Sequence, residues 1–99
     1  MLETNDNKYY TLSEFYKIFA DVTRLKMLML LIKERMNVSD ISNKLGMTHS
    51  SISHQLKNLR QLNMVKAEKI GKEVFYSLAD SHIEIILKFG LEHINEKDN

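Results

Sequence analysis

The spacing of apolar residues in this 99-residue sequence changes twice, and those changes limit the folds open to the chain. Up to Leu62, apolar residues recur every three or four positions, as in amphipathic helices. Residues 64–70 and 73–78 instead have the character of two short strands, and Gly71-Lys72 between them is typical of a hairpin turn. The helical spacing returns from Asp80 to about Glu96. We therefore predict a mainly helical chain with one β-hairpin, in the order α-α-α-α-β-β-α.

Capping residues mark the ends of the helices before the hairpin. We expect helices over residues 11–19, 21–33, 38–45 and 48–62. Asp21, Asn37 and Thr48 are residue types whose side chains accept a hydrogen bond from the first turn of a helix, and Gly46 can adopt the left-handed conformation that ends one. The second helix is apolar nearly all round and is expected at the centre of the core. The fourth is expected to bury a stripe of four residues, Ile52, Leu56, Leu59 and Leu62.

Length and composition restrict the class of protein. We expect one domain over residues 1–99, with an ordered core from 10 to 96 and flexible ends at 1–9 and 97–99. No apolar run approaches the roughly 20 residues of a membrane span, and the N-terminus is polar, so we expect a cytoplasmic protein that does not engage a membrane. Cysteine is absent, which excludes disulfides and thiolate metal sites.

Positive charge is concentrated in one segment. The formal net charge of the chain is only +1. Residues 44–72 nevertheless carry six basic side chains against the single acid Glu68, a net of +5, while eight basic and twelve acidic residues elsewhere leave −4. A basic block in an otherwise acidic chain favours a surface that faces a polyanion such as nucleic acid. The alternative is an ordinary solvated face.

The third and fourth predicted helices are joined by Gly46-Met47, and their lengths, caps and short connection are typical of a helix-turn-helix. In that motif the second helix lies in the major groove of DNA, and its N-terminal residues contact base edges. Here the residues at the start of the fourth helix are small and rich in hydroxyl groups. Four of them lie beside or opposite the buried stripe: His49, Ser50, Ser53 and His54. Lys57 and Arg60, further along, are better placed for phosphates. The alternative is that these side chains only cap and solvate a helix.

The segment SSISHQLKNLRQLNMVKAEKIGKEVFYSL, with FADVTRLKMLMLL upstream, resembles the core of the ArsR/SmtB family of winged-helix repressors. The resemblance covers about residues 12–96, and Val22 departs from the proline that is common there in the family. It implies a winged helix-turn-helix homodimer, formed through the first and last helices, that binds an inverted-repeat operator and leaves it when an effector binds. It also places DNA contacts at seven positions, namely Val38, His49, Ser50, Ser53, His54 and the two residues of the wing tip, Gly71-Lys72.

The last predicted helix carries four candidate metal ligands, Asp80, His82, His93 and Glu96. On a helical wheel the two histidines and Glu96 cluster around Phe89, inside the apolar arc, where ionisable groups need partners. His82 and His93 are eleven residues apart, roughly 16 Å along a helix, so one chain cannot bring both to one ion. Two such helices packed antiparallel about a twofold axis would form two symmetric intersubunit sites. The alternatives are a helix cap for Asp80 and ordinary packing for each histidine.

The spacing of these residues also resembles the last-helix site of the zinc-sensing branch of the family. Two imidazoles and two carboxylates suit tetrahedral Zn(II), with Co(II) as a surrogate, and four protein ligands leave no open position for a substrate. The resemblance further implies a hydrogen bond from His93 to a backbone carbonyl near Asn63. We therefore predict a zinc-responsive repressor, not an enzyme, with no small-molecule substrate. A repressor of the same fold that responds to Ni(II) or Co(II), to another effector, or to none is the alternative.

Overall fold

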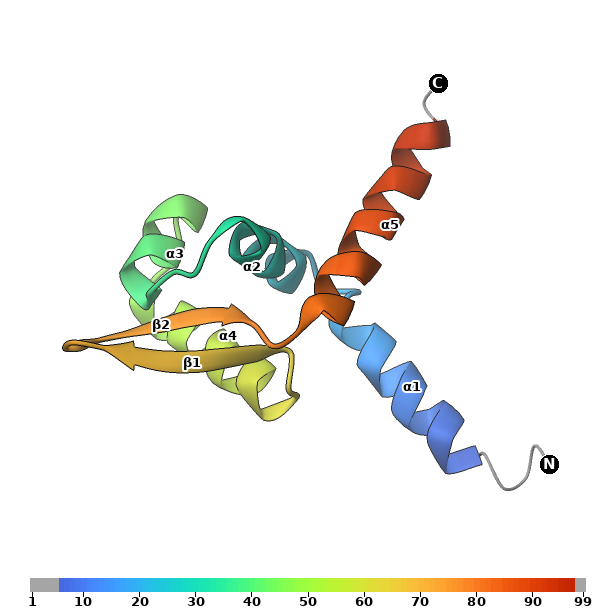
Figure 1. The fold of residues 1–99 in the computed structure, drawn as a ribbon, viewed down its shortest axis with the longest axis horizontal. Coiled ribbons are helices and arrows are strands. Elements are labelled where there is room, and N and C mark those ends of the chain that lie inside the picture. Colours follow the sequence, from blue (N-terminus) through green and yellow to red (C-terminus); the bar gives the residue numbers. More distant parts are fainter. Residues whose placement is uncertain (1–5, 98–99) are drawn as a thin grey trace.

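The computed structural model describes residues 6–97. Flexible ends were predicted at residues 1–9 and 97–99, and of these, residues 1–5, 98 and 99 lie outside the described residues. The order of elements is α-α-α-α-β-β-α, as the spacing of apolar residues predicted (Figure 1). The elements are α1 (Asp6–Ile18), α2 (Val22–Lys33), α3 (Val38–Leu45), α4 (His49–Gln61), β1 (Val65–Ile70), β2 (Glu73–Leu78) and α5 (Ser81–Lys97).

The predicted caps are present at the starts of three helices. Side-chain oxygens of Asp21, Asn37 and Thr48 accept hydrogen bonds from the backbone N–H three residues on, at 2.9, 2.8 and 3.1 Å. Each bond satisfies one of the N–H groups that a helix leaves free at its start. Gly46 ends α3 at φ +65°, in the left-handed region that a residue with a Cβ rarely adopts. The turn between α3 and α4 is therefore set by short-range interactions.

The core lies between α2, α3, α4 and the base of the hairpin. Its fully buried side chains include Met27 and Leu28 of α2, Ile41 of α3 and the stripe of α4 formed by Ile52, Leu56 and Leu59. The prediction that Leu62 belongs to this stripe is wrong, because Leu62 is 44% exposed. The helix ends at Gln61, and Asn63 turns the chain in a left-handed conformation at φ +60°, so Leu62 no longer follows the helical repeat.

The first helix is longer than predicted. It begins at Asp6 and not at Thr11, so residues 6–9, expected to be flexible, are helical. Asp6 lies in the first turn, where a carboxylate is favoured by the helix dipole. The apolar pattern missed this turn because Tyr9 and Tyr10 are exposed and contribute nothing to a buried stripe. At the other end, α5 includes Lys97, one residue beyond the expected ordered core.

The hairpin has the predicted two-residue turn. Its register pairs Val65 with Leu78 at the base and Ile70 with Glu73 at the tip. Gly71 has φ +66°, as the first turn residue of a type II′ hairpin requires. The hairpin reaches away from the body on the side opposite to the projecting ends of α1 and α5 (Figure 1). No helix within residues 6–97 has the length and apolar character to cross a membrane.

Candidate DNA-binding face and metal ligands

The buried stripe of α4 determines which of its residues face outward. Because one side of the helix is fully buried, the residues predicted to contact DNA bases lie beside that side or opposite it. All four of them are exposed: His49, Ser50, Ser53 and His54. They occupy the first two turns of α4, directly after the Thr48 cap. The structure thus presents a small, polar helix surface of the kind that enters a major groove.

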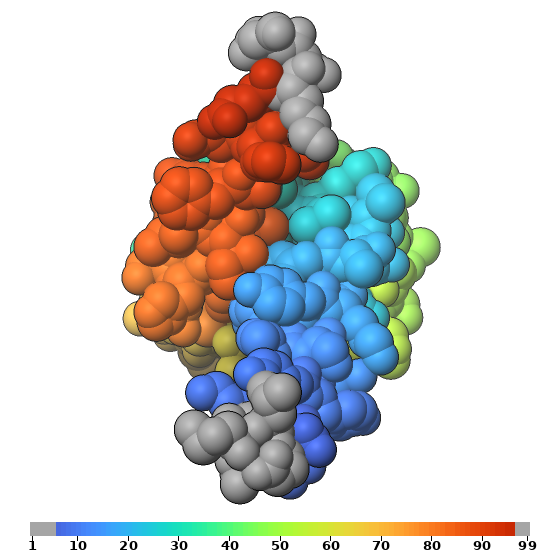
Figure 2. Space-filling view, turned by 90° about the vertical axis from the view of Figure 1, so that its right-hand side faces the viewer, coloured from blue at the N-terminus to red at the C-terminus, as the bar shows by residue number. Residues whose placement is uncertain are grey.

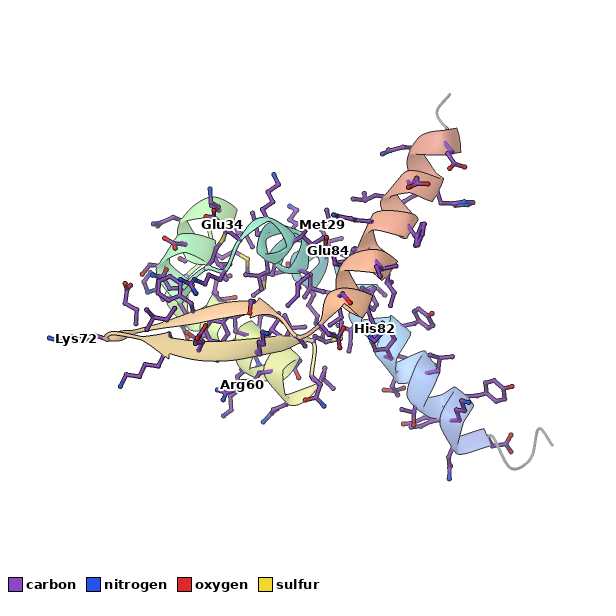
Figure 3. The ribbon with its side chains drawn as sticks, in the orientation of Figure 1. Met29, Glu34, Arg60, Lys72, His82 and Glu84 are labelled. Atoms are coloured by element: carbon purple, nitrogen blue, oxygen red, sulfur yellow. The ribbon has the colours of Figure 1, made fainter. Side chains whose placement is uncertain are left out.

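Three cations extend this surface. Lys57 and Arg60 follow on the exposed side of α4, and Lys72 stands at the tip of the hairpin (Figure 3). None of the three takes part in an ion pair among residues 6–97. Their charges are therefore available to phosphates. His54, Lys57, Asn58 and Gln61 also line a shallow polar depression beside the reading turn.

Val38, the first residue of α3, is half-buried and packs against the core. The start of α3 also lies next to the hairpin, because Asn37 donates a hydrogen bond from Nδ2 to Oε1 of Glu73 at 2.7 Å. Sequence reasoning identified Asn37 as a cap but did not find Glu73. The two residues are 36 positions apart, and no local pattern links them. The structure therefore joins the helix-turn-helix to the wing through a contact that only the fold reveals.

Asp80 and His82 lie together at the start of α5. Oδ1 of Asp80 accepts a hydrogen bond from the backbone N–H of His82 at 2.9 Å, so Asp80 also serves the helix start. The same oxygen lies 3.4 Å from Nδ1 of His82. Two ligands on one tetrahedral zinc ion, each bonded at about 2.0–2.1 Å, are about 3.3–3.4 Å apart. This pair thus has the separation that a shared metal ion requires.

His93 and Glu96 lie three residues apart near the other end of α5, and both are exposed. Among residues 6–97 of one chain, no three His, Cys, Asp or Glu side chains come together as a metal-binding group. Each end of α5 therefore supplies two candidate ligands, and a complete site needs a second source of ligands.

The side of α5 that carries these residues is uncovered in a single chain. Ile83 and Leu87 face the core and are buried, whereas Phe89 on the opposite side is 64% exposed and Ile85 is 47% exposed. We expected the candidate ligands to lie on a buried face, but His82, with a side chain 83% exposed, does not. The apolar arc predicted from the sequence is therefore wider than the side of α5 that packs on the core of its own chain.

Asn63 and His93 of the same chain are not brought together. The carbonyl of Met64 accepts a hydrogen bond from the backbone N–H of Ala79 at 3.0 Å, which places the end of α4 beside the start of α5. His93 lies twelve residues into α5 from Ser81, about 18 Å along its axis, and the helix runs away from α4 (Figure 1). A direct link between these two residues therefore has to cross between chains.

Known proteins resemble this chain in sequence and in fold. Residues 21–67, from the cap of α2 into β1, match the family described as bacterial regulatory protein, arsR family. The chain is 32% identical to the cadmium resistance transcriptional regulatory protein CadC of Listeria innocua over 87 residues, which make up 87% of this chain and 73% of that one. The protein belongs to the ArsR family. It is 33% identical over 87 residues to the transcriptional repressor SmtB homolog of Synechocystis sp., covering 88% of this chain.

A further relative supports the fold as well. The HTH-type transcriptional regulator NmtR of Mycobacterium tuberculosis is 35% identical over 74 residues, 75% of this chain. The solution structure of apo-NmtR matches 91% of this chain and 76% of that structure, with a TM-score of 0.81 and 29% identity. The ArsR-family chain described here spans 66% of the length of the SmtB homolog and 62% of that of NmtR. The family comprises winged-helix transcriptional regulators and not enzymes, as the sequence predicted.

Proposed function

We propose that this ArsR-family protein is a zinc-responsive repressor whose metal-free dimer binds an inverted-repeat operator and releases it when Zn(II) binds at two intersubunit sites. The observation that carries the proposal is the 3.4 Å separation of Asp80 Oδ1 and His82 Nδ1 on the uncovered side of α5. A second candidate pair, His93 and Glu96, lies at the far end of the same helix. Two antiparallel copies of α5 would place one pair opposite the other, twice per dimer.

The proposed dimer uses α1 and α5. Eight of the large apolar side chains exposed within residues 6–97 lie on these helices: Tyr9, Tyr10, Leu12, Tyr16, Ile85, Phe89, Leu91 and Ile94. The two helices share one side of the molecule, which Figure 2 shows face-on. Large apolar side chains exposed in such number on two neighbouring helices are typical of a protein–protein contact surface. Burial of this surface against a second copy would also cover the candidate metal ligands.

Zinc is proposed on the chemistry of the donor set. Two imidazoles and two carboxylates without cysteine suit tetrahedral Zn(II), with Co(II) as a spectroscopic surrogate, whereas Ni(II) favours more ligands in an octahedral arrangement. That CadC is a cadmium resistance regulator supports a metal effector in general. An effector other than zinc, namely Ni(II), Co(II), another ligand or none, is the competing proposal.

On the DNA side, α4 would occupy the major groove through His49, Ser50, Ser53 and His54, flanked by phosphate contacts from Lys57 and Arg60. Val38 and the wing tip at Gly71-Lys72 would complete the contact surface. A dimer spaces two such helices for adjacent grooves about 34 Å apart, so a change in dimer shape would alter affinity. The segment before α5 is hydrogen-bonded to the segment after α4, the helix that would contact the bases. A change at the metal site could therefore reach α4 by a route of few intervening residues. In the dimer this route would run from His93 of the second protomer to the backbone of Asn63.

The test begins with a duplex selected from random DNA by the metal-free protein. We expect added Zn(II) to lower the affinity for this duplex by about tenfold or more, and a chelator to restore it. His82→Ala should abolish the response while leaving metal-free DNA binding intact, and His54→Ala is the matched control that should weaken DNA binding itself. His93→Gln should retain part of the zinc affinity but lose the response.

Two results would contradict the proposal. DNA affinity that does not change with zinc would refute the allosteric function. Titration with Co(II) separates the metals, because tetrahedral and octahedral Co(II) differ strongly in visible absorption. An octahedral spectrum would favour the nickel or cobalt alternative over zinc.

A further inference from the structure

The hairpin is well anchored at its base and weakly at its tip. Val65 is buried, and Tyr76 forms a two-way backbone bridge with Met36, at 2.8 and 3.0 Å. All residues from Glu68 to Val74 are exposed. From Tyr76 to Glu73 the strand extends about 10 Å beyond the bridge. Without further support, the tip would be free to move relative to the helix-turn-helix.

Three consecutive residues between α2 and α3 supply that support, and we call Arg35, Met36 and Asn37 the wing anchor. Met36 makes the backbone bridge. The Arg35 guanidinium lies 5.6 Å from the centre of the Phe75 ring and 3.8 Å from Oε1 of Glu68. Asn37 bonds to Glu73, the residue directly after the turn. Of these contacts, the Asn37–Glu73 bond reaches closest to the tip.

The amide of Asn37 has two partners, and they determine its orientation. Its Oδ1 accepts the bond from the Asp40 backbone N–H at 2.8 Å, while its Nδ2 donates to Glu73 at 2.7 Å. Because an N–H must donate and a carboxylate can only accept, the reverse orientation would lose both bonds. One side chain thus caps α3 and holds the wing in place.

The chemistry of Glu73 is otherwise unexpected in this position. A carboxylate next to the Gly71-Lys72 tip repels DNA phosphates, which a basic wing is expected to attract. A glutamate at this position is consistent with a structural use for its carboxylate. The bond to Asn37 is such a use, because it carries charge assistance and is shorter than a typical neutral bond.

We propose that Asn37 and Glu73 are positioning residues for DNA binding. Their hydrogen bond holds the wing tip at a set distance from α4, so that Lys72 and the reading helix contact one duplex together. This inference rests on the proposed DNA-binding function. Loss of the bond would leave both contact surfaces intact. The wing tip would then lose conformational entropy when it becomes ordered on DNA, and the affinity would fall.

The experiment compares variants that hold charge constant. Glu73→Gln and Glu73→Ala both remove the negative charge, but only the glutamine oxygen can still accept from Asn37. Asn37→Ser keeps a good helix cap and loses the amide donor. We expect Glu73→Ala to bind a selected duplex about three- to tenfold more weakly than Glu73→Gln. Asn37→Ser should lose a similar factor relative to wild type, and in the Glu73→Ala background it should add no further loss.

A second readout separates positioning from stability. Lys72→Ala should weaken binding and reduce its salt dependence in the Glu73→Gln background, and should do so much less in the Glu73→Ala background. The thermal midpoints of the two Glu73 variants should differ by no more than the few degrees that one exposed hydrogen bond accounts for. Equal DNA affinity of these two variants, or an equal effect of Lys72→Ala in both, would overturn the inference. If the wild-type protein selects no duplex at all, the proposed DNA-binding function fails, and the positioning role that rests on it fails with it; a duplex that binds both Glu73 variants equally refutes the positioning role alone.

Discussion

The salt dependence of DNA binding can be worked out from the three cations of the proposed contact surface. Lys57, Arg60 and Lys72 are exposed and take part in no ion pair among residues 6–97, so each is available to a phosphate. A dimer then carries six such groups. With a slope of about −0.9 per neutralised phosphate, the logarithm of the binding constant should fall with a slope of about −5 against the logarithm of salt concentration. Between about 50 and 200 mM salt, affinity should fall roughly a thousandfold.

Lys72→Ala removes two of the six cations and should make this slope shallower by about 1.8. Fluorescence anisotropy with a labelled duplex of about 30 base pairs, enough to span two major grooves one helical turn apart, measures the slope directly. Lys88→Ala is the matched control. It removes the same charge from α5, where Lys88 is paired with Glu84 at 2.6 Å and lies far from the wing tip. A wild-type slope shallower than about −3, or equal effects of the two variants, would refute the assignment of these cations to phosphates.

Three other predictions concern stability and metal binding. Leu56→Ala, at a fully buried position, should lower the free energy of unfolding by about 2–5 kcal/mol in urea denaturation, whereas exposed Leu62→Ala should cost under about 1 kcal/mol; similar losses would contradict the assigned core. Thr48→Ala should cost about 1 kcal/mol by the same assay, and Thr48→Ser should recover most of it if the cap is responsible. Zinc affinity, followed by competition with a chelating dye, should weaken as the pH is lowered, because protons compete with the metal for its ligands. A zinc affinity that does not change with pH would argue against histidine ligands.

The order of elements and the helix-turn-helix followed from patterns that act over a few residues. Caps at Asp21, Asn37 and Thr48 join groups three positions apart, and Gly46 and Gly71 act through their own backbone conformation. Such features depend little on the rest of the chain, and sequence reasoning found all of them. It failed at Leu62, where the helix had already ended, and at the start of α1, whose first turn has no buried side to show an apolar pattern.

The sequence identified which residues of α5 are candidate metal ligands, but it did not predict that they would be exposed in a single chain. The apolar arc of α5 predicted burial, and a helical wheel cannot tell a side that packs on the core from one left open for a second chain. The structure separates the two, with Ile83 and Leu87 against the core and Phe89 uncovered. It also shows that Asn63 of one chain lies near the start of α5, whereas His93 lies about 18 Å along that helix, so a direct contact between the two residues would have to join different chains.

By itself, the sequence determined the fold class, the position of the helix-turn-helix, the hairpin turn and the candidate residues for binding DNA or metal, because each depends on residue type and short spacing. Only the tertiary structure decided how these parts are placed relative to one another. The bond between Asn37 and Glu73 is the clearest case, since it joins residues 36 positions apart and has no local signal. Contacts of this kind exist only once packing has brought distant segments together, and packing is a property of the whole chain.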